Sequence, residues 1–81
     1  MSKREKLVGR FKNEPPDFTW QELVTMLKGM GYRLSIGAGS RRRFVHGDFP
    51  PICLHEPHPS NILKRYQIGQ IKEALEENNL I

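Results

Sequence analysis

Residues 32–46 read YRLSIGAGSRRRFVH, and this stretch predicts the centre of the fold. Apolar and polar side chains alternate over residues 32–36, which is the period-two pattern of a half-buried strand. The glycine-rich residues 37–40 predict a turn, and residues 41–46 resume the alternation. The stretch therefore predicts two antiparallel strands joined by a short loop.

The arginine run of the second strand is divided between two faces. Alternate residues of a strand point to opposite faces, so Arg42 and Phe44 share one face while Arg41 and Arg43 share the other. Phe44 is the apolar member and is expected in the core. Arg41 and Arg43 are therefore expected to face solvent or a ligand.

A third strand is predicted from Phe49 to His55, after the turn at residues 47–48. Ile52 and Leu54 would occupy its apolar face, and Cys53 and His55 the other. Short loops between successive strands are typical of an antiparallel meander.

Helices are predicted on both sides of these strands. Thr19-Trp20-Gln21-Glu22 is a capping box that begins a helix, which ends at Gly31. A last helix is predicted from about Ser60 or Lys64 onward. Its buried stripe would consist of Ile68, Ile71, Ala74 and Leu75.

The N-terminal residues predict a short basic helix that Ser2 could cap, ended by Pro15 and Pro16. We therefore expect a basic N-terminal helix with a proline-rich linker over residues 1–16, and the main domain over residues 17–81. The element order is α-α-β-β-β-α. It predicts an α+β fold in which helices cover one face of a three-stranded antiparallel sheet, as in domains that bind double-stranded RNA.

Size and composition limit the function classes. The 81 residues suffice for one small core. The single cysteine, Cys53, excludes an intramolecular disulfide and is expected to be a small buried side chain. No apolar run is long enough to span a membrane, so we expect a cytoplasmic protein without a membrane partner. The net charge of +4, with arginines clustered at 41–43, points to a polyanionic partner such as RNA.

Three histidines are candidates for proton transfer near neutral pH: His46, His55 and His58. RNA can supply its own nucleophile, the 2′-hydroxyl, so a protein must only move protons and neutralise the phosphorane with cations such as arginine. His58, between Pro57 and Pro59, is the best placed of the three. His46 is expected to be partly packed beside the face of Phe44.

The spacing Cys53-X-His55-X-X-His58 also raises a metal hypothesis. A fourth ligand is missing from the pattern, and the prolines limit closure of the loop around one ion. The sequence therefore predicts no metal and no small-molecule cofactor.

The chain resembles the HicA (YcfA-like) toxins over roughly residues 17 to 81. The resemblance rests on Gly39-Ser40-Arg41-Arg42-Arg43-Phe44, on His55-Glu56-Pro57-His58-Pro59 and on Leu63-Lys64-Arg65-Tyr66 at the start of the last helix. These toxins are small bacterial mRNA interferases with a fold like that of double-stranded-RNA-binding domains. The resemblance implies ribosome-independent cleavage of mRNA, restrained by a HicB-type antitoxin that covers the active site.

One position departs from the family. Many members carry a histidine taken as catalytic directly after the Gly-Ser pair, where this chain has Arg41. Arginine stays protonated and cannot act as a general base near pH 7.

Two readings therefore stay open. In the first, the chain is a metal-independent endoribonuclease with His58 and His55 as catalytic residues. Its RNA-binding residues are Ser40, Arg41, Arg43, Lys64 and Arg65. In the second, it is a non-catalytic module that binds RNA or pairs with the antitoxin.

Overall fold

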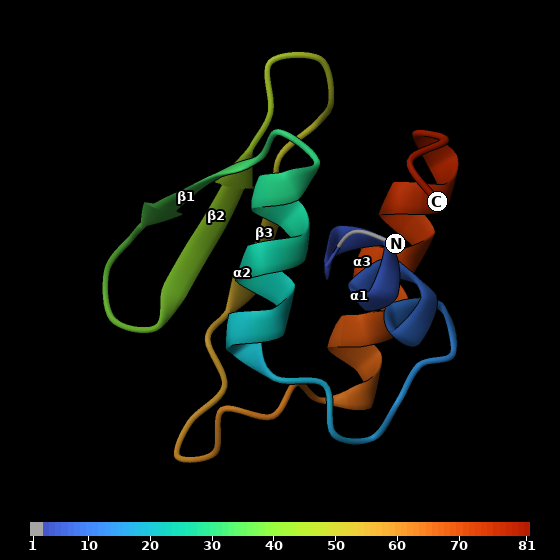
Figure 1. The fold of residues 1–81 in the computed structure, drawn as a ribbon. Helices are drawn as coiled ribbons and strands as arrows, with labels where there is room; N and C mark the ends of the chain where they lie inside the picture. Colours follow the sequence, from blue (N-terminus) through green and yellow to red (C-terminus); the bar gives the residue numbers. More distant parts are fainter. Residues whose placement is uncertain (1–2) are drawn as a thin grey trace.

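The fold is a three-stranded antiparallel sheet with three helices on one side (Figure 1). The computed structural model describes residues 3–81, so the expected cap at Ser2 lies outside the described residues. The elements are α1 (Lys3–Lys12), α2 (Trp20–Gly29), β1 (Arg33–Ile36), β2 (Arg41–Val45), β3 (Ile52–His55) and α3 (Arg65–Glu77). The predicted α+β class and the order α-α-β-β-β-α are confirmed.

The sheet is a meander in the order β1-β2-β3. Phe44 of β2 lies opposite Leu34 of β1 and Ile52 of β3, so one apolar row crosses all three strands. Phe44 is completely buried and its ring lies 5.6 Å from that of Trp20 in α2. This row is the sheet's contribution to the core.

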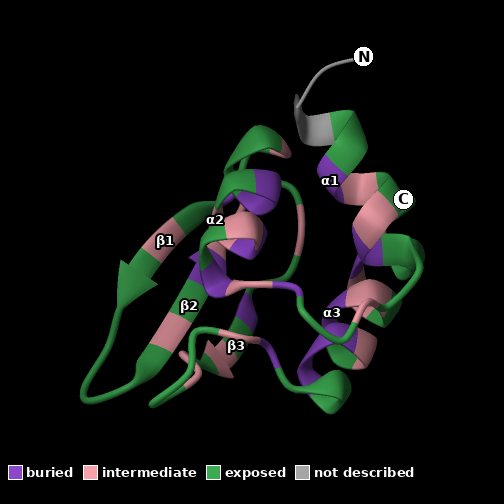
Figure 2. Ribbon diagram, turned by 60° about the horizontal axis from the view of Figure 1, so that its bottom comes forward, coloured by how far each residue is buried: buried purple, intermediate pink, exposed green. Residues whose placement is uncertain are grey.

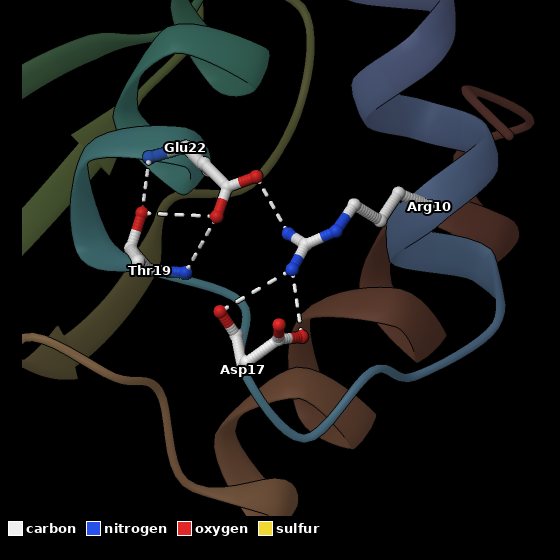
Figure 3. A network of polar contacts seen from close by, with 4 residues as sticks. All are labelled: Arg10, Asp17, Thr19 and Glu22. Carbon is white, nitrogen blue, oxygen red and sulfur yellow. Dashed lines mark hydrogen bonds and ion pairs between the residues drawn. The ribbon is translucent and has the colours of Figure 1, made fainter.

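The capping box predicted for α2 is present (Figure 3). The Glu22 amide donates to Thr19 Oγ1 at 3.2 Å, and the Thr19 amide donates to Glu22 Oε1 at 3.1 Å. The other carboxylate oxygen of Glu22 pairs with the Arg10 guanidinium, which also pairs with Asp17. The same residues thus begin α2 and tie α1 to it.

Gly31 ends α2 as predicted, with φ at +99°. A Cβ at this position would lie 2.8 Å from Nε2 of His46, so glycine is required both by the backbone conformation and by close packing. His46 fills this corner of the fold. Its ring packs at 4.9 Å from Tyr32 and at 4.7 Å from Phe49.

The core draws on every layer of the fold. Figure 2 shows buried segments concentrated on the helices, while much of β1 is exposed. Helix α1 contributes Leu7 and Phe11, and Phe11 is fully buried with its ring 5.2 Å from Phe18. Helix α1 therefore shares one core with the remaining elements. Independent folding of residues 17–81 stays a prediction.

The structure corrects three sequence-based expectations. Cys53 is exposed, because it lies on the sheet face that no helix covers. Ile36 is 71% exposed, because the end of β1 and its turn lie away from α2 (Figure 1). Strand β3 begins at Ile52 rather than at Phe49, since two prolines precede it and proline cannot donate to a ladder.

Smaller differences concern the helices. Helix α3 begins at Arg65, and Ala74 is only half-buried, whereas the other three members of the predicted stripe are buried. Met26 of α2 is fully buried beside the predicted apolar face. Burial raises the pKa of the Tyr32 hydroxyl, and the side chain of Asn78 offsets part of this rise.

Replacing Phe11 tests whether α1 is part of the core. We expect Phe11→Ala to lower the free energy of unfolding by about 3–5 kcal/mol, because it leaves a cavity between α1 and Phe18. Urea denaturation followed by circular dichroism measures the change. Lys12→Ala, at an exposed neighbouring position, is the control and should change stability by less than about 0.5 kcal/mol. Equal stability of the two variants would show that α1 is dispensable.

Candidate functional site

The uncovered face of the sheet gathers the arginines predicted to bind a ligand. Residues directly opposite each other in an antiparallel ladder share a face, so the pairing fixes the layout. Arg41 lies opposite His55, and Arg43 lies between Ser35 and Cys53. We call these side chains, together with Arg33, the outer face. The three strands contain no acidic residue, so the face carries only positive charge.

An open hollow of about 450 Å³ lies over this face. It is lined by Ser35, Gly37, Arg41, Arg43, Cys53 and His55, and also by Arg42 and Leu54, which alternate to the face of Phe44. One imidazole therefore shares a concave surface with two exposed guanidinium groups. This is a suitable surface for a phosphodiester.

His55 is held from three directions although it is exposed. Its backbone pairs with Arg41, and its carbonyl accepts a hydrogen bond of 2.8 Å from Gln67 Nε2. Its ring nitrogen Nδ1 lies 3.0 Å from Ser40 Oγ. These contacts fix both the position of the residue and the setting of its ring.

Ser40 is itself anchored next to β3. Its carbonyl accepts from the amide of Glu56 at 2.8 Å, which extends the ladder one step beyond His55. The turn that presents it needs Gly39, which has φ of +60°, and it needs Gly37, where a Cβ would lie 3.2 Å from Arg41 Cβ. The glycines thus bring the hydroxyl to the histidine.

His58 does not line the same hollow as His55. It lines an adjacent one, formed by Gly39, Ser40, Arg42, Glu56, Pro57 and His58. Arg42 Nε donates to Glu56 Oε1 at 3.0 Å, and its Nη1 donates to the carbonyls of Gly39 and Arg41. His58 is exposed in this second hollow, which is also lined by Ser40, the partner of the His55 ring.

The third histidine, His46, has a structural setting. Its Nδ1 accepts from the amide of Asp48 at 3.0 Å, so Nε2 carries the proton and donates to the carbonyl of Met30 at 3.1 Å. The expectation of a partly packed ring is met, but its partners are Tyr32 and Phe49. His46 therefore has no nitrogen left for proton transfer to a substrate.

The two basic residues at the start of α3 lie apart from the hollow. Lys64 is the exposed N-cap residue. Arg65 lines a different depression, with Glu14, Pro15, Pro16 and Leu63. The sequence groups them with the arginines of β2, but the structure places them at a second position on the surface.

Gln67 is the supporting residue that the sequence analysis missed. It is 4% exposed, and its Oε1 accepts from the amide of Lys64 at 3.0 Å while Nε2 donates to the His55 carbonyl. It thereby joins the start of α3 to the end of β3. A glutamine at the third position of a helix is half of a capping box, and this signal could have identified it.

The described residues contain neither a cluster of metal ligands nor a membrane-spanning helix. Across residues 3–81, no three His, Cys, Asp or Glu side chains are grouped so that they could hold a metal ion. No helix in that range is long and apolar enough to cross a membrane.

Comparison with known proteins identifies one family. The family model for the HicA toxin of bacterial toxin–antitoxin systems matches residues 20–77, which run from the first residue of α2 to the last residue of α3. No curated protein and no solved structure matches the chain.

The link that Gln67 makes between the start of α3 and the His55 carbonyl can be tested by removing its side-chain amide. Gln67→Met keeps the approximate volume but leaves the Lys64 amide and the His55 carbonyl without partners. We expect a loss of about 1–3 kcal/mol in the free energy of unfolding. Gln70→Met, on the exposed side of α3, is the matched control. If both variants unfold at the same urea concentration, Gln67 does not couple α3 to β3.

Proposed function

The chain belongs to the HicA toxin family of bacterial toxin–antitoxin systems, and from this premise we propose that it is a toxin that binds and cleaves mRNA on its outer face. Cleavage would require no metal ion. The observation that carries the proposal is the cross-strand pair of Arg41 and His55, which share a hollow with Arg43 and no carboxylate.

This pair also accounts for the departure at position 41. Many HicA toxins have a histidine there, and in this chain the residue directly across the ladder is His55. Opposite residues have Cβ atoms about 5 Å apart on one face, so an imidazole at 55 can serve nearly the same space. In this proposal His55 is the general base, one strand across from position 41, and Arg41 is a phosphate ligand.

The proposed reaction gives each of these side chains a separate role. His55 accepts the proton of the 2′-hydroxyl as the 2′-oxygen attacks phosphorus, and Arg41 and Arg43 neutralise the phosphorane oxygens. The bond from phosphorus to the 5′-oxygen breaks, and His58 donates a proton to that leaving oxygen from the adjacent hollow. The products are a 2′,3′-cyclic phosphate and a 5′-hydroxyl. Proton and charge balance without a co-reactant.

The remaining basic residues extend the surface that RNA would follow. Lys64 and Arg65 would contact phosphates beyond the hollow and carry no catalytic role, which fits their separate position. A HicB-type antitoxin would inhibit the toxin by covering the outer face. We place this activity in the cytoplasm, where mRNA is found.

The alternative is a module that binds RNA without cutting it. Two observations favour it: arginine replaces the usual catalytic histidine at position 41, and the hollow that contains His55 does not contain His58. On this reading Arg41 and Arg43 contribute affinity alone. Binding without turnover by the wild-type protein would establish it.

Cleavage of a labelled RNA in the presence of EDTA tests the proposal. We expect wild type to produce 2′,3′-cyclic phosphate ends, and we expect His55→Ala to cut about 10²–10⁴-fold more slowly because it lacks the general base. His58→Ala should also slow cleavage, while both variants retain RNA affinity. An RNA with 2′-deoxy sugars is the substrate control and must stay intact. Products with a free 3′-hydroxyl would contradict the mechanism.

In cells, induction of wild type should arrest growth and fragment mRNA, and His55→Ala should do neither at equal expression. Normal growth with intact mRNA from a folded, well-expressed wild type would contradict the toxin function and favour the binding module.

Salt dependence tests the role of the two arginines. The double variant Arg41→Ala/Arg43→Ala should bind RNA more weakly, and its slope of log affinity against log salt should fall by about 1.4–1.8, the loss of two phosphate contacts. Fluorescence anisotropy over a salt series measures this slope. Lys6→Ala/Lys28→Ala removes the same charge from exposed positions on the helices and is the control. Equal slopes for both double variants would mean that general charge, not the outer face, attracts RNA.

A further inference from the structure

The contact between Ser40 and His55 indicates that Ser40 has a different role from the arginines that follow it. The sequence alone predicts that Ser40 binds phosphate. In the structure its hydroxyl lies 3.0 Å from Nδ1 of His55, and the hollow with the exposed arginines is lined by His55 and not by Ser40. The Ser40 hydroxyl is therefore a partner of the His55 ring rather than part of the hollow that holds the exposed arginines.

The anchoring of Ser40 makes this contact persistent. The backbone bond from the Glu56 amide to the Ser40 carbonyl fixes the turn to the end of β3, one residue from His55. The Arg42–Glu56 pair adds a second link across the same two segments. A histidine at an exposed strand end would otherwise turn freely about its side-chain bonds.

The hydroxyl also fits the protonation states that the reaction needs. Because Nδ1 is engaged with Ser40, Nε2 is the nitrogen left to act as a general base, and an unprotonated Nε2 puts the proton of the neutral ring on Nδ1. Nδ1–H then donates to Ser40 Oγ. After Nε2 has taken the substrate proton, Nδ1–H still donates to the same oxygen, so Ser40 accepts throughout the cycle.

We propose that Ser40 is a positioning residue that holds His55 in the Nδ1–H form and leaves Nε2 for proton transfer. This inference rests on the proposed function for its kinetic consequence only, because the state of the ring can be measured without RNA. It assigns Ser40 to turnover rather than to affinity.

Three variants of the full chain distinguish positioning from binding. Ser40→Ala should lower kcat about 3- to 10-fold, the effect of one hydrogen bond, with the Kd for a short RNA unchanged. Ser40→Thr keeps the hydroxyl and should restore kcat. Thr25→Ala removes an exposed hydroxyl from α2, outside the outer face, and it should leave both constants unchanged.

The tautomer of the His55 ring is a second readout, which would not change if Ser40 only stabilised the fold. ¹⁵N chemical shifts of the neutral His55 ring, measured in the RNA-free protein, should show the Nδ1–H form in wild type and Ser40→Thr. They should show a mixture of the two forms in Ser40→Ala.

Each contrary result has a separate meaning. A wild-type kcat in Ser40→Ala, or a loss confined to Kd, overturns the positioning role. The Nε2–H form in wild type overturns the assignment of the ring. Failure of the wild type to cleave any RNA refutes the proposed function, and the nitrogen shifts then still decide whether Ser40 fixes the ring.

Discussion

The register of β2 against its two neighbours is the constraint on which the rest of the structure depends. Phe44 lies in the apolar row with Leu34 and Ile52, and it packs against Trp20 of α2. A slip of one residue would turn Phe44 to solvent and drive Arg43 toward the core. Burying an unpaired guanidinium costs several kcal/mol, so the arrangement tolerates one register. That register sets the outer face.

The helix layer supports the site from behind. Gln67 joins α3 to the carbonyl of His55, and the segment before α3 pairs with the segment before α2 through the bridge between Thr19 and Ile62. The ion pairs of Arg10 are partly exposed, and such pairs contribute about 1 kcal/mol or less. Buried contacts such as Phe11 against Phe18 therefore carry most of the attachment of α1.

The pairing of Arg41 with His55 across β2 and β3 places both side chains on one surface. Arginine and histidine occupy the two ends of one ladder position, so exchanging the residue types across it would keep both groups on the same surface. The surface would carry one guanidinium and one imidazole in either arrangement. The ladder thus places the imidazole of His55 on the same surface as position 41.

Local sequence patterns predicted most of the elements and the two faces of β2. The capping box at Thr19, the exit at Gly31 and the alternation about Phe44 are local patterns whose physics involves neighbours in the chain, and each was predicted. The tertiary structure decided which faces are covered and which distant side chains meet. Cys53 is exposed because no layer covers its face, and Ile36 because α2 does not extend over the end of β1.

The same distinction holds for the site. The sequence predicted His55 and the arginines as site residues, but it did not predict the contact with Ser40, the support from Gln67, or the separation of His58 and Arg65 from the hollow. These features join residues that lie 12 or 15 positions apart or in different elements. Only the pairing register and the docking of α3 determine such distances, because periodicity along one segment carries no information about where another segment packs.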